Sequence, residues 1–317
     1  MASMTPSADV PPAPWTGRFD GDSPEHRRWW QAVVPSTRAA ASGSVPKPAA
    51  LIGFASDEGV RRNKGRTGAA AAPAAIRKAL GPLAFHLDRS VTDAGDVAVS
   101  EGALEDAQAR LGSVVSELLD AGHLTTVLGG GHETAYASYL GVSGSQVVQQ
   151  GARLGVLNLD AHFDLRDEPV PSSGTPFLQM AQAEAAAGRG FRYAVVGISE
   201  ANNTRALFDT ARRLGVRYLL DEDCGTDRVH AFVASFLADI DVLYLTIDLD
   251  VLPAEVAPGV SAPAAFGVPL PVISAVCRQV AASGKLVHLD VAELNPVFDV
   301  DGRTARVAAR LLDTLLR

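Results

Sequence analysis

From residue 49 onward, short runs of Val, Ile and Leu alternate with longer amphipathic segments. The short runs are nearly continuous in apolar residues, which is typical of strands that are covered on both faces. Strands that alternate with helices favour a mostly parallel sheet between two layers of helices. We therefore predict an α/β three-layer sandwich with about eight strands, at Ala50–Phe54, Val91–Val97, Leu124–Leu128, Leu154–Leu159, Tyr193–Ile198, Arg217–Leu220, Val242–Ile247 and Leu286–Val291.

The amphipathic segments between these runs are the predicted helices of the two outer layers. They are Pro73–Leu80, Ala103–Ala121, Pro176–Ala187, Thr204–Leu214, Val229–Ala238, Pro271–Ala282 and Arg303–Leu316.

The first 48 residues lack this alternation, so we predict an arm and linker there and one domain over residues 49–317. Residues 1–14 are rich in Ala, Pro and Ser and are predicted to be a mobile tail. Ser23 followed by Pro24 is a helix-start signal, and it predicts a helix that ends near Val34. All three tryptophans precede residue 31, which predicts an arm docked by aromatic burial. Residues 35–48 read as a linker.

The composition excludes several classes of function. The net charge of -8 and the pI near 5.4 argue against nucleic acid as a partner. The two cysteines, Cys224 and Cys277, are typical of core thiols in a reducing compartment. No apolar run approaches the ~20 residues of a membrane span, and the N-terminus lacks the zones of a signal peptide. We expect a cytoplasmic protein that has no membrane partner.

Polar clusters follow four of the predicted strands. Ligands of parallel α/β sheets bind beyond the carboxyl ends of the strands, so these clusters are expected to meet in one site. The clusters are Gly129–Glu133, Asp160–Asp164, Asp248–Asp250 and Ala292–Pro296.

The spacing within the clusters indicates a cation. Asp160, His162 and Asp164 alternate, so an extended backbone would point their side chains the same way. Converging carboxylates repel one another unless positive charge lies between them. Gly129–Gly131 lack the Lys and Ser/Thr of a phosphate-binding loop, so they are expected to form a tight turn that brings His132 close to the acids.

The candidate ligands favour a particular kind of metal centre. Two imidazoles and four carboxylates, with no thiolate, favour hard or borderline cations, and Mn²⁺ is the first choice. Six ligands are too many for one catalytic zinc and suit two ions about 3.5–4 Å apart. Such a pair lowers the pKa of a bridging water, which predicts hydrolysis at a polarised carbon. The candidates are His132, Asp160, His162, Asp164, Asp248 and Asp250.

In order and spacing, these clusters resemble the motifs of the arginase/agmatinase (ureohydrolase) family over about residues 50–317. The resemblance implies two Mn²⁺ ions per subunit and a closed homo-oligomer. One ion would be held by His132, Asp160, Asp164 and Asp248, and the other by Asp160, His162, Asp248 and Asp250. Glu293 matches the carboxylate that receives the cationic amidine or guanidine end of the substrate.

One stretch departs from the arginase pattern. Ser172–Phe177 stands where arginases and agmatinases carry a His-Gly pair, and it resembles the formimidoylglutamase branch of the family. That branch implies hydrolysis of N-formimidoyl-L-glutamate to L-glutamate and formamide, in histidine degradation, by a hydroxide that bridges the two Mn²⁺ ions. A guanidino-acid ureohydrolase or agmatinase-like enzyme is the alternative, and an inactive metal-binding regulatory protein is a third. The same branch is indicated by Gly129–Glu133, Asp160–Arg166, Asn63–Arg66 and Trp15–Asp20.

The chemistry of this substrate suggests further site residues. Asp164 is expected to take a proton from the nucleophile and pass it to the leaving amine. Arg166 is the candidate bidentate clamp for a substrate carboxylate, with a solvent-exposed loop arginine as the open alternative. Asn202, Asn203 and Ser173 are further candidates for substrate binding.

Two residues after the first strand stay undecided. Asn63 and Arg66 belong to the segment that resembles the branch. Their neighbours are also basic, so a generic basic loop is an equal interpretation.

Overall fold

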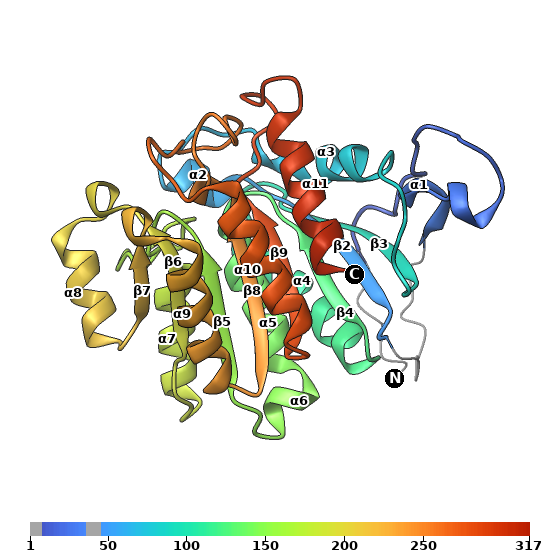
Figure 1. Cartoon of the computed structure of the whole chain (residues 1–317). Coiled ribbons are helices and arrows are strands. Elements are labelled where there is room, and N and C mark those ends of the chain that lie inside the picture. Colours follow the sequence, from blue (N-terminus) through green and yellow to red (C-terminus); the bar gives the residue numbers. More distant parts are fainter. Residues whose placement is uncertain (1–7, 36–45) are drawn as a thin grey trace.

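The computed structural model describes residues 8–35 and 46–317. Its strands form one sheet of nine parallel strands in the order β1-β3-β2-β4-β9-β8-β5-β6-β7 (Figure 1). The strands are β1 (Val33–Pro35), β2 (Ala49–Ala55), β3 (Val91–Ala98), β4 (Leu124–Leu128), β5 (Leu154–Leu159), β6 (Tyr193–Ile198), β7 (Arg217–Leu220), β8 (Val242–Asp248) and β9 (Leu286–Ala292). All eight predicted strands are present, and the α/β sandwich is confirmed.

The ninth strand corrects the prediction for the arm. Instead of one helix that ends near Val34, the arm has a 3-10 turn at Pro24–His26 and the short helix α1 (Trp29–Ala32). The chain then enters β1, where Val33 lies opposite Val91 of β3. The β-branched pair Val33 and Val34 favours a strand, and Pro35 is compatible with an edge strand but not with a helix interior.

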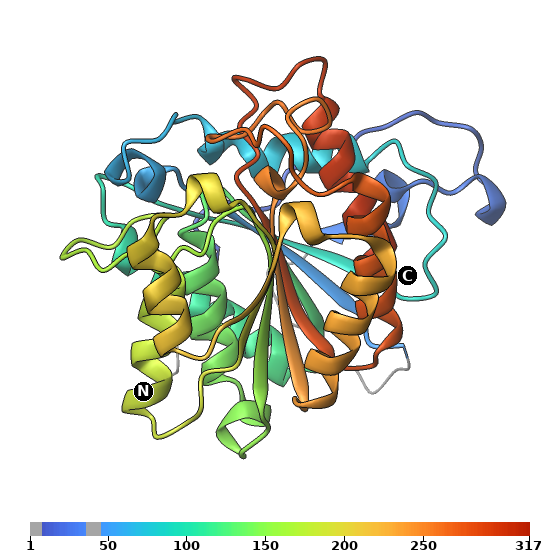
Figure 2. The same ribbon diagram turned by 60° about the vertical axis from the view of Figure 1, so that its left-hand side comes forward.

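Helices cover both faces of the sheet (Figure 2). On one face α11 packs against α3 and α10, and α10 packs against α9; on the other, α4 packs against α5, and α5 against α7. The helices are α2 (Glu58–Arg62), α3 (Ala72–Leu80), α4 (Leu104–Asp120), α5 (Thr134–Gly144), α6 (Gln146–Gln149), α7 (Pro176–Ala186), α8 (Arg205–Arg213), α9 (Thr226–Ala238), α10 (Leu270–Ala282) and α11 (Arg303–Leu315).

The arm docks through its tryptophans. Trp29 has no exposed surface, and its indole N–H donates to Asp313 of α11 at 3.1 Å. Trp15 is also buried, and its indole donates to Asp93 of β3 at 2.7 Å. The arm therefore contacts both the sheet and a covering helix, while the domain boundary at residue 48 stays a prediction.

The beginning of the described chain also lies against the sheet. Val10 and Asp96 of β3 exchange two backbone hydrogen bonds, each of 2.9 Å. The tail predicted over residues 1–14 is therefore wrong for this part, because backbone pairing ties it to β3. Residues 1–7, and residues 36–45 of the predicted linker, lie outside the described residues.

The strand order explains how distant motifs meet. The four strands with polar clusters at their carboxyl ends are neighbours at the centre of the sheet, in the order β4-β9-β8-β5. Since all four run parallel, the clusters lie side by side at one edge of the sheet. Within residues 8–35 and 46–317, no helix has the length and hydrophobicity needed to cross a membrane.

Candidate metal centre and active site

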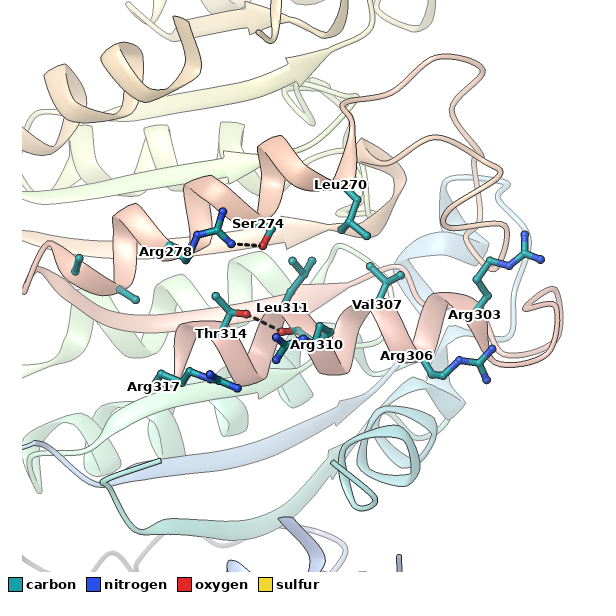
Figure 3. A pocket seen from close by; sticks show the side chains of 12 residues that line it. Leu270, Ser274, Arg278, Arg303, Arg306, Val307, Arg310, Leu311, Thr314 and Arg317 are labelled. Atoms are coloured by element: carbon teal, nitrogen blue, oxygen red, sulfur yellow. Dashed lines mark hydrogen bonds between the residues drawn. The ribbon is translucent and has the colours of Figure 1, made fainter. Parts of the chain in front are cut away.

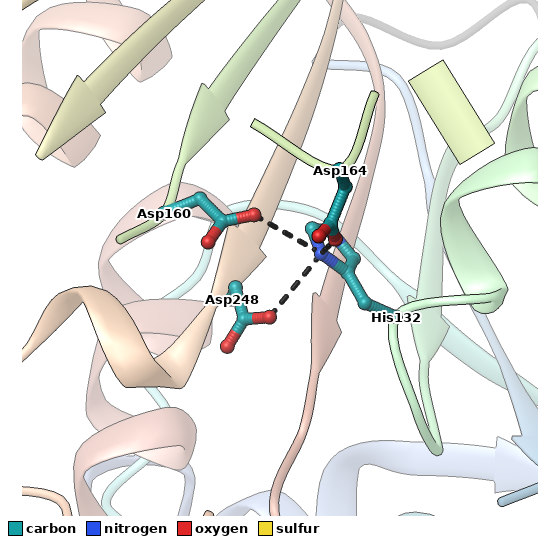
Figure 4. Close-up of side chains that lie close together, drawn as sticks. All are labelled: His132, Asp160, Asp164 and Asp248. Carbon is teal, nitrogen blue, oxygen red and sulfur yellow. Dashed lines mark hydrogen bonds and ion pairs between the residues drawn. The ribbon is translucent and has the colours of Figure 1, made fainter. Parts of the chain in front are cut away.

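The first group of candidate ligands surrounds Nδ1 of His132 (Figure 4). This atom lies 2.9 Å from Oδ2 of Asp164 and 3.2 Å from one oxygen each of Asp160 and Asp248. Ligand atoms that share one ion lie about 3 Å apart, because bonds from nitrogen or oxygen to a divalent metal are about 2.1 Å long. The four side chains therefore have the spacing of a metal-binding group.

The second group lies around His162. Its Nδ1 is 3.0 Å from Oδ2 of Asp250 and 3.5 Å from Oδ1 of Asp160. Asp160 thus turns one carboxylate oxygen toward each histidine, which is the arrangement of a bridging ligand.

Asp248 was also expected in both groups. The structure places one of its oxygens with the His132 group, while the other accepts a hydrogen bond from the backbone N–H of Asp250 at 2.9 Å. A bridging role for Asp248 therefore stays a prediction.

The centre concentrates negative charge away from water. Burial lowers the pKa of His132, but its hydrogen bonds to the three surrounding carboxylates raise the pKa by more. The pKa of His132 therefore lies well above its ordinary value. Burial, Asp250 and Asp160 together hold the pKa of Asp248 well above its usual range. In the described chain the ion-pair partners of these acids are the two histidines. Such a donor set fits divalent cations.

Two site residues have positive backbone φ angles. Asp164 has φ 48° and Glu293 has φ 69°, both in the left-handed region that residues other than glycine seldom adopt. Such conformations concentrate at functional sites, where the surrounding structure enforces them.

Glu293 follows β9 and is held from two sides. Its Oε1 accepts a hydrogen bond from the backbone N–H of His132 at 2.8 Å, and its Oε2 accepts one from the hydroxyl of Ser261. Burial raises the pKa of Glu293 to about 7, and the Ser261 hydrogen bond opposes that rise. Ser261 was not among the predicted site residues, because a serine in a long loop carries no signal of its own in the sequence.

A cavity of about 190 Å³ opens over the centre. Ten of the eleven predicted site residues line it, and the eleventh, Asp160, lies fully buried beneath them. The ten are His132, His162, Asp164, Arg166, Ser173, Asn202, Asn203, Asp248, Asp250 and Glu293.

Arg166 stands at the outer side of this cavity. Its side chain is 49% exposed, and its guanidinium lies 3.7 Å from Glu168. Its backbone N–H donates to the carbonyl of Gly174 at 2.9 Å. A Cβ at Gly174 would lie 2.7 Å from Cδ of Arg166, so a larger residue at this position would displace the Arg166 side chain.

The two asparagines differ in environment. Asn202 is exposed at the cavity. The buried amide of Asn203 instead donates to the carbonyls of Ala161 and Ser199 at 2.9 and 2.8 Å and accepts from the N–H of Phe163 at 3.1 Å. Both ends of this amide hold the loop of Asp160 and His162, so Asn203 supports this loop, and its role in substrate binding stays a prediction.

The structure also separates Asn63 from Arg66. Asn63 lines the cavity and donates to the hydroxyl of Ser173 at 3.1 Å. Arg66 donates to the carbonyls of Val260 and Ser261 and stacks 4.0 Å from the ring centre of Phe298. Arg66 therefore holds the loop that carries Ser261.

A larger cavity of about 650 Å³ lies between α10 and α11 (Figure 3). Its lining combines apolar side chains with arginines and contains none of the candidate ligands. It is therefore separate from the metal centre. The arginines are Arg278, Arg303, Arg306, Arg310 and Arg317.

Comparison with known proteins indicates the same family as the motifs in the four polar clusters. A model of the arginase family matches residues 47–317. The chain belongs to the arginase family. The formimidoylglutamase of Nocardia farcinica is 61% identical over 96% of this chain and 96% of its own length. That of Chromobacterium violaceum is 50% identical over 96% and 97%.

Solved arginase-family structures share the fold. A formiminoglutamase from Trypanosoma cruzi, solved with Mn²⁺, has a TM-score of 0.76 and 25% identity over 85% of this chain and 92% of that one. The formimidoylglutamase of Bacillus subtilis has a TM-score of 0.79, with 22% identity over 94% and 95% of the two chains.

Proposed function

We propose that this chain hydrolyses N-formimidoyl-L-glutamate to L-glutamate and formamide, as a step in histidine degradation. Family membership and the formimidoylglutamase relatives make it a hydrolase of amidine C–N bonds. One observation carries the choice of substrate: a cavity with a carboxylate, Glu293, beside the candidate ligands also has a half-exposed guanidinium, Arg166, on its outer side. These charges complement a cationic amidine that carries carboxylates.

The proposed cofactor is a pair of Mn²⁺ ions in each subunit. His132, Asp160, Asp164 and Asp248 would hold one ion, and Asp160, His162 and Asp250 the other, with Asp248 as a second bridge. When bound, the ions would supply a shared hydroxide near neutral pH, because coordination lowers the pKa of water. The oxygen-rich ligand set and the Mn²⁺ in the T. cruzi formiminoglutamase both support manganese.

Glu293 is proposed to receive the cationic formimidoyl group. Its carboxylate is buried, so a cation that binds there lowers its pKa and keeps it charged. Ser261 and the His132 backbone N–H occupy one lone pair on each oxygen, which fixes the direction of the remaining lone pairs. The amidine nitrogens would thus be oriented with their carbon toward the centre.

Asp164 is proposed to move the proton. It lines the cavity with 13% of its side chain exposed, so it would reach both the centre and a substrate in the cavity. A carboxylate in this position takes a proton during attack and delivers it to the departing amine of glutamate.

Three further residues are proposed to bind the glutamate part. Arg166 would pair with a carboxylate through two parallel hydrogen bonds. Ser173, which accepts a hydrogen bond from Asn63, still has its own proton to donate to substrate. Asn202 supplies an exposed amide at the same cavity.

Product analysis tests this function. The Mn²⁺-loaded protein is expected to convert formimidoylglutamate to glutamate and formamide, and the chelated protein is the control. Release of ammonia and formylglutamate would mean that the other C–N bond breaks. Urea from guanidino acids, with no reaction of formimidoylglutamate, would favour the ureohydrolase alternative. Bound Mn²⁺ without hydrolysis of any amidine would favour the regulatory one.

We also propose a cytoplasmic location and a closed homo-oligomer. The two cysteines are unpaired and buried, and burial raises the pKa of each to about 12, which suits inert thiols in a reducing compartment. Cell fractionation tests the location, and sedimentation equilibrium tests the assembly.

A further inference from the structure

Asp290 is a buried acid for which the proposed chemistry has no use. It lies inside β9 with no exposed surface. Its Oδ1 accepts a hydrogen bond from the hydroxyl of Thr246 at 2.7 Å, and its Oδ2 accepts one from Tyr244 at 2.5 Å. Thr246 and Asp290 are opposite one another in the register of β8 and β9, so the sheet itself holds the pair together.

Thr246 also contacts the first candidate ligand. Its Oγ1 lies 3.0 Å from Nε2 of His132, on the side of the ring opposite the carboxylate group. A threonine hydroxyl has one proton, and in this structure it is donated to Asp290. The Thr246 oxygen therefore accepts the proton of His132 Nε2.

We propose that Thr246 and Asp290 form a relay that keeps His132 in the tautomer with its proton on Nε2. When a cation takes the place of the proton on Nδ1, the lone pair of Nδ1 would point toward that cation, among Asp160, Asp164 and Asp248. The relay rests on the proposed function, because it acts through His132 as a ligand. Thr246 and Asp290 are positioning residues that touch neither substrate nor metal.

The relay should matter for metal affinity. A ligating imidazole binds through an unprotonated nitrogen, and an acceptor on the other nitrogen fixes the ring and makes it more basic. Loss of such a partner typically lowers metal affinity about 10- to 100-fold. Phe177 packs edge-on against the ring at 5.4 Å, which restricts tilt but supplies no acceptor for Nε2.

The first test removes the hydroxyl. Thr246→Val should weaken binding of one Mn²⁺ by about 10- to 100-fold, measured by titration of the electron paramagnetic resonance signal of free Mn²⁺. Thr246→Ser keeps the hydroxyl and should bind nearly as the native protein does. Thr126→Val is the matched control, since Thr126 is equally buried on β4 and its hydroxyl has no partner in the described structure. It should leave Mn²⁺ binding unchanged.

The second test separates a relay from simple charge attraction. Asp290→Leu has a similar size but cannot accept, so the Thr246 hydroxyl would turn to donate to His132 and favour the wrong tautomer. In a relay, the double variant with Thr246→Val loses no more affinity than the weaker-binding single variant. Additive losses would mean that Asp290 acts through its charge, and the relay would be overturned.

Failure of the relay is distinguishable from failure of the proposed function. If the native protein binds Mn²⁺ and hydrolyses formimidoylglutamate while Thr246→Val binds Mn²⁺ equally well, only the relay is wrong. A native protein that binds no Mn²⁺ overturns both. If Thr246→Val does not fold, Asp290→Leu still tests the relay against the native protein, because unchanged Mn²⁺ affinity in Asp290→Leu refutes it.

Discussion

Replacing Arg166 with alanine tests how the cavity recognises its substrate. The proposed clamp forms two charge-assisted hydrogen bonds to one carboxylate of formimidoylglutamate. Hydrogen bonds to charged groups contribute about 1.5–3 kcal/mol, and the side chain is 49% exposed, so solvent screening places the loss near the lower end. A loss of about 1.5–2 kcal/mol corresponds to about a 10- to 30-fold change.

The loss of binding free energy in Arg166→Ala should appear as a higher KM. The clamped carboxylate does not change during the reaction, so Arg166 binds the ground state and the transition state equally, and kcat should stay nearly constant. The product L-glutamate retains both carboxylates, and its inhibition constant should rise by the same factor.

Steady-state kinetics with added Mn²⁺ measure both constants. Arg61→Ala is the matched control, because Arg61 is a nearby exposed arginine that pairs with Glu58 at 2.7 Å and does not line the cavity. It should leave KM unchanged. An unchanged KM in Arg166→Ala would refute the clamp, and a fall in kcat alone would assign Arg166 to the chemical step.

Three further predictions concern stability. Mn²⁺ at 100 times its Kd should raise the free energy of unfolding by about 2.7 kcal/mol per site, and scanning calorimetry that finds the same Tm with and without chelator would contradict the metal centre. Trp29→Ala should lower the free energy of unfolding by about 3–5 kcal/mol in urea titrations and leave Mn²⁺ affinity intact; a loss below about 1 kcal/mol would show that the arm is not docked. Hydrogen bonds from Arg61 and then Arg62 lower the pKa of Glu58 from 4.5 to about 2, so Glu58 stabilises the fold above about pH 4.5 and this contribution is lost as the pH falls through 2. Because Arg61 is 63% exposed, Glu58→Gln should lower stability at pH 7 by at most about 1 kcal/mol, with no difference left near pH 2, and a difference that grows on acidification would contradict this.

The central elements of the fold are predictable because each is covered on both faces. β5 and β6 have the predicted ends, since a continuous apolar run leaves little choice of boundary. Helix α5 was not predicted: its Ala, Ser and Gly residues are buried on several sides, so it lacks the polar stripe by which surface helices are recognised. The prediction of one helix in the arm was wrong for a different reason. Strand β1 forms only through its pairing with β3, which is distant in sequence.

Some residues of the candidate site could likewise be predicted from the sequence, and others could not. The ligand candidates could be found from sequence because unpaired acids after apolar strands are unusual and their alternation has a geometric meaning. Ser261, Asn63 and the support role of Asn203 depend on which loops approach one another, and local sequence does not encode that. Thr246 and Asp290 read as ordinary strand residues until the register places them side by side.

The left-handed backbone at Glu293 has a conformational cost. A residue with a Cβ pays roughly 1–2 kcal/mol to adopt φ 69°, whereas glycine adopts it freely. Glycine at position 293 would relieve this strain, but it would also leave the His132 N–H and the Ser261 hydroxyl without their acceptor and remove the carboxylate proposed to hold the amidine. Stabilising substitutions should therefore be sought elsewhere in the chain.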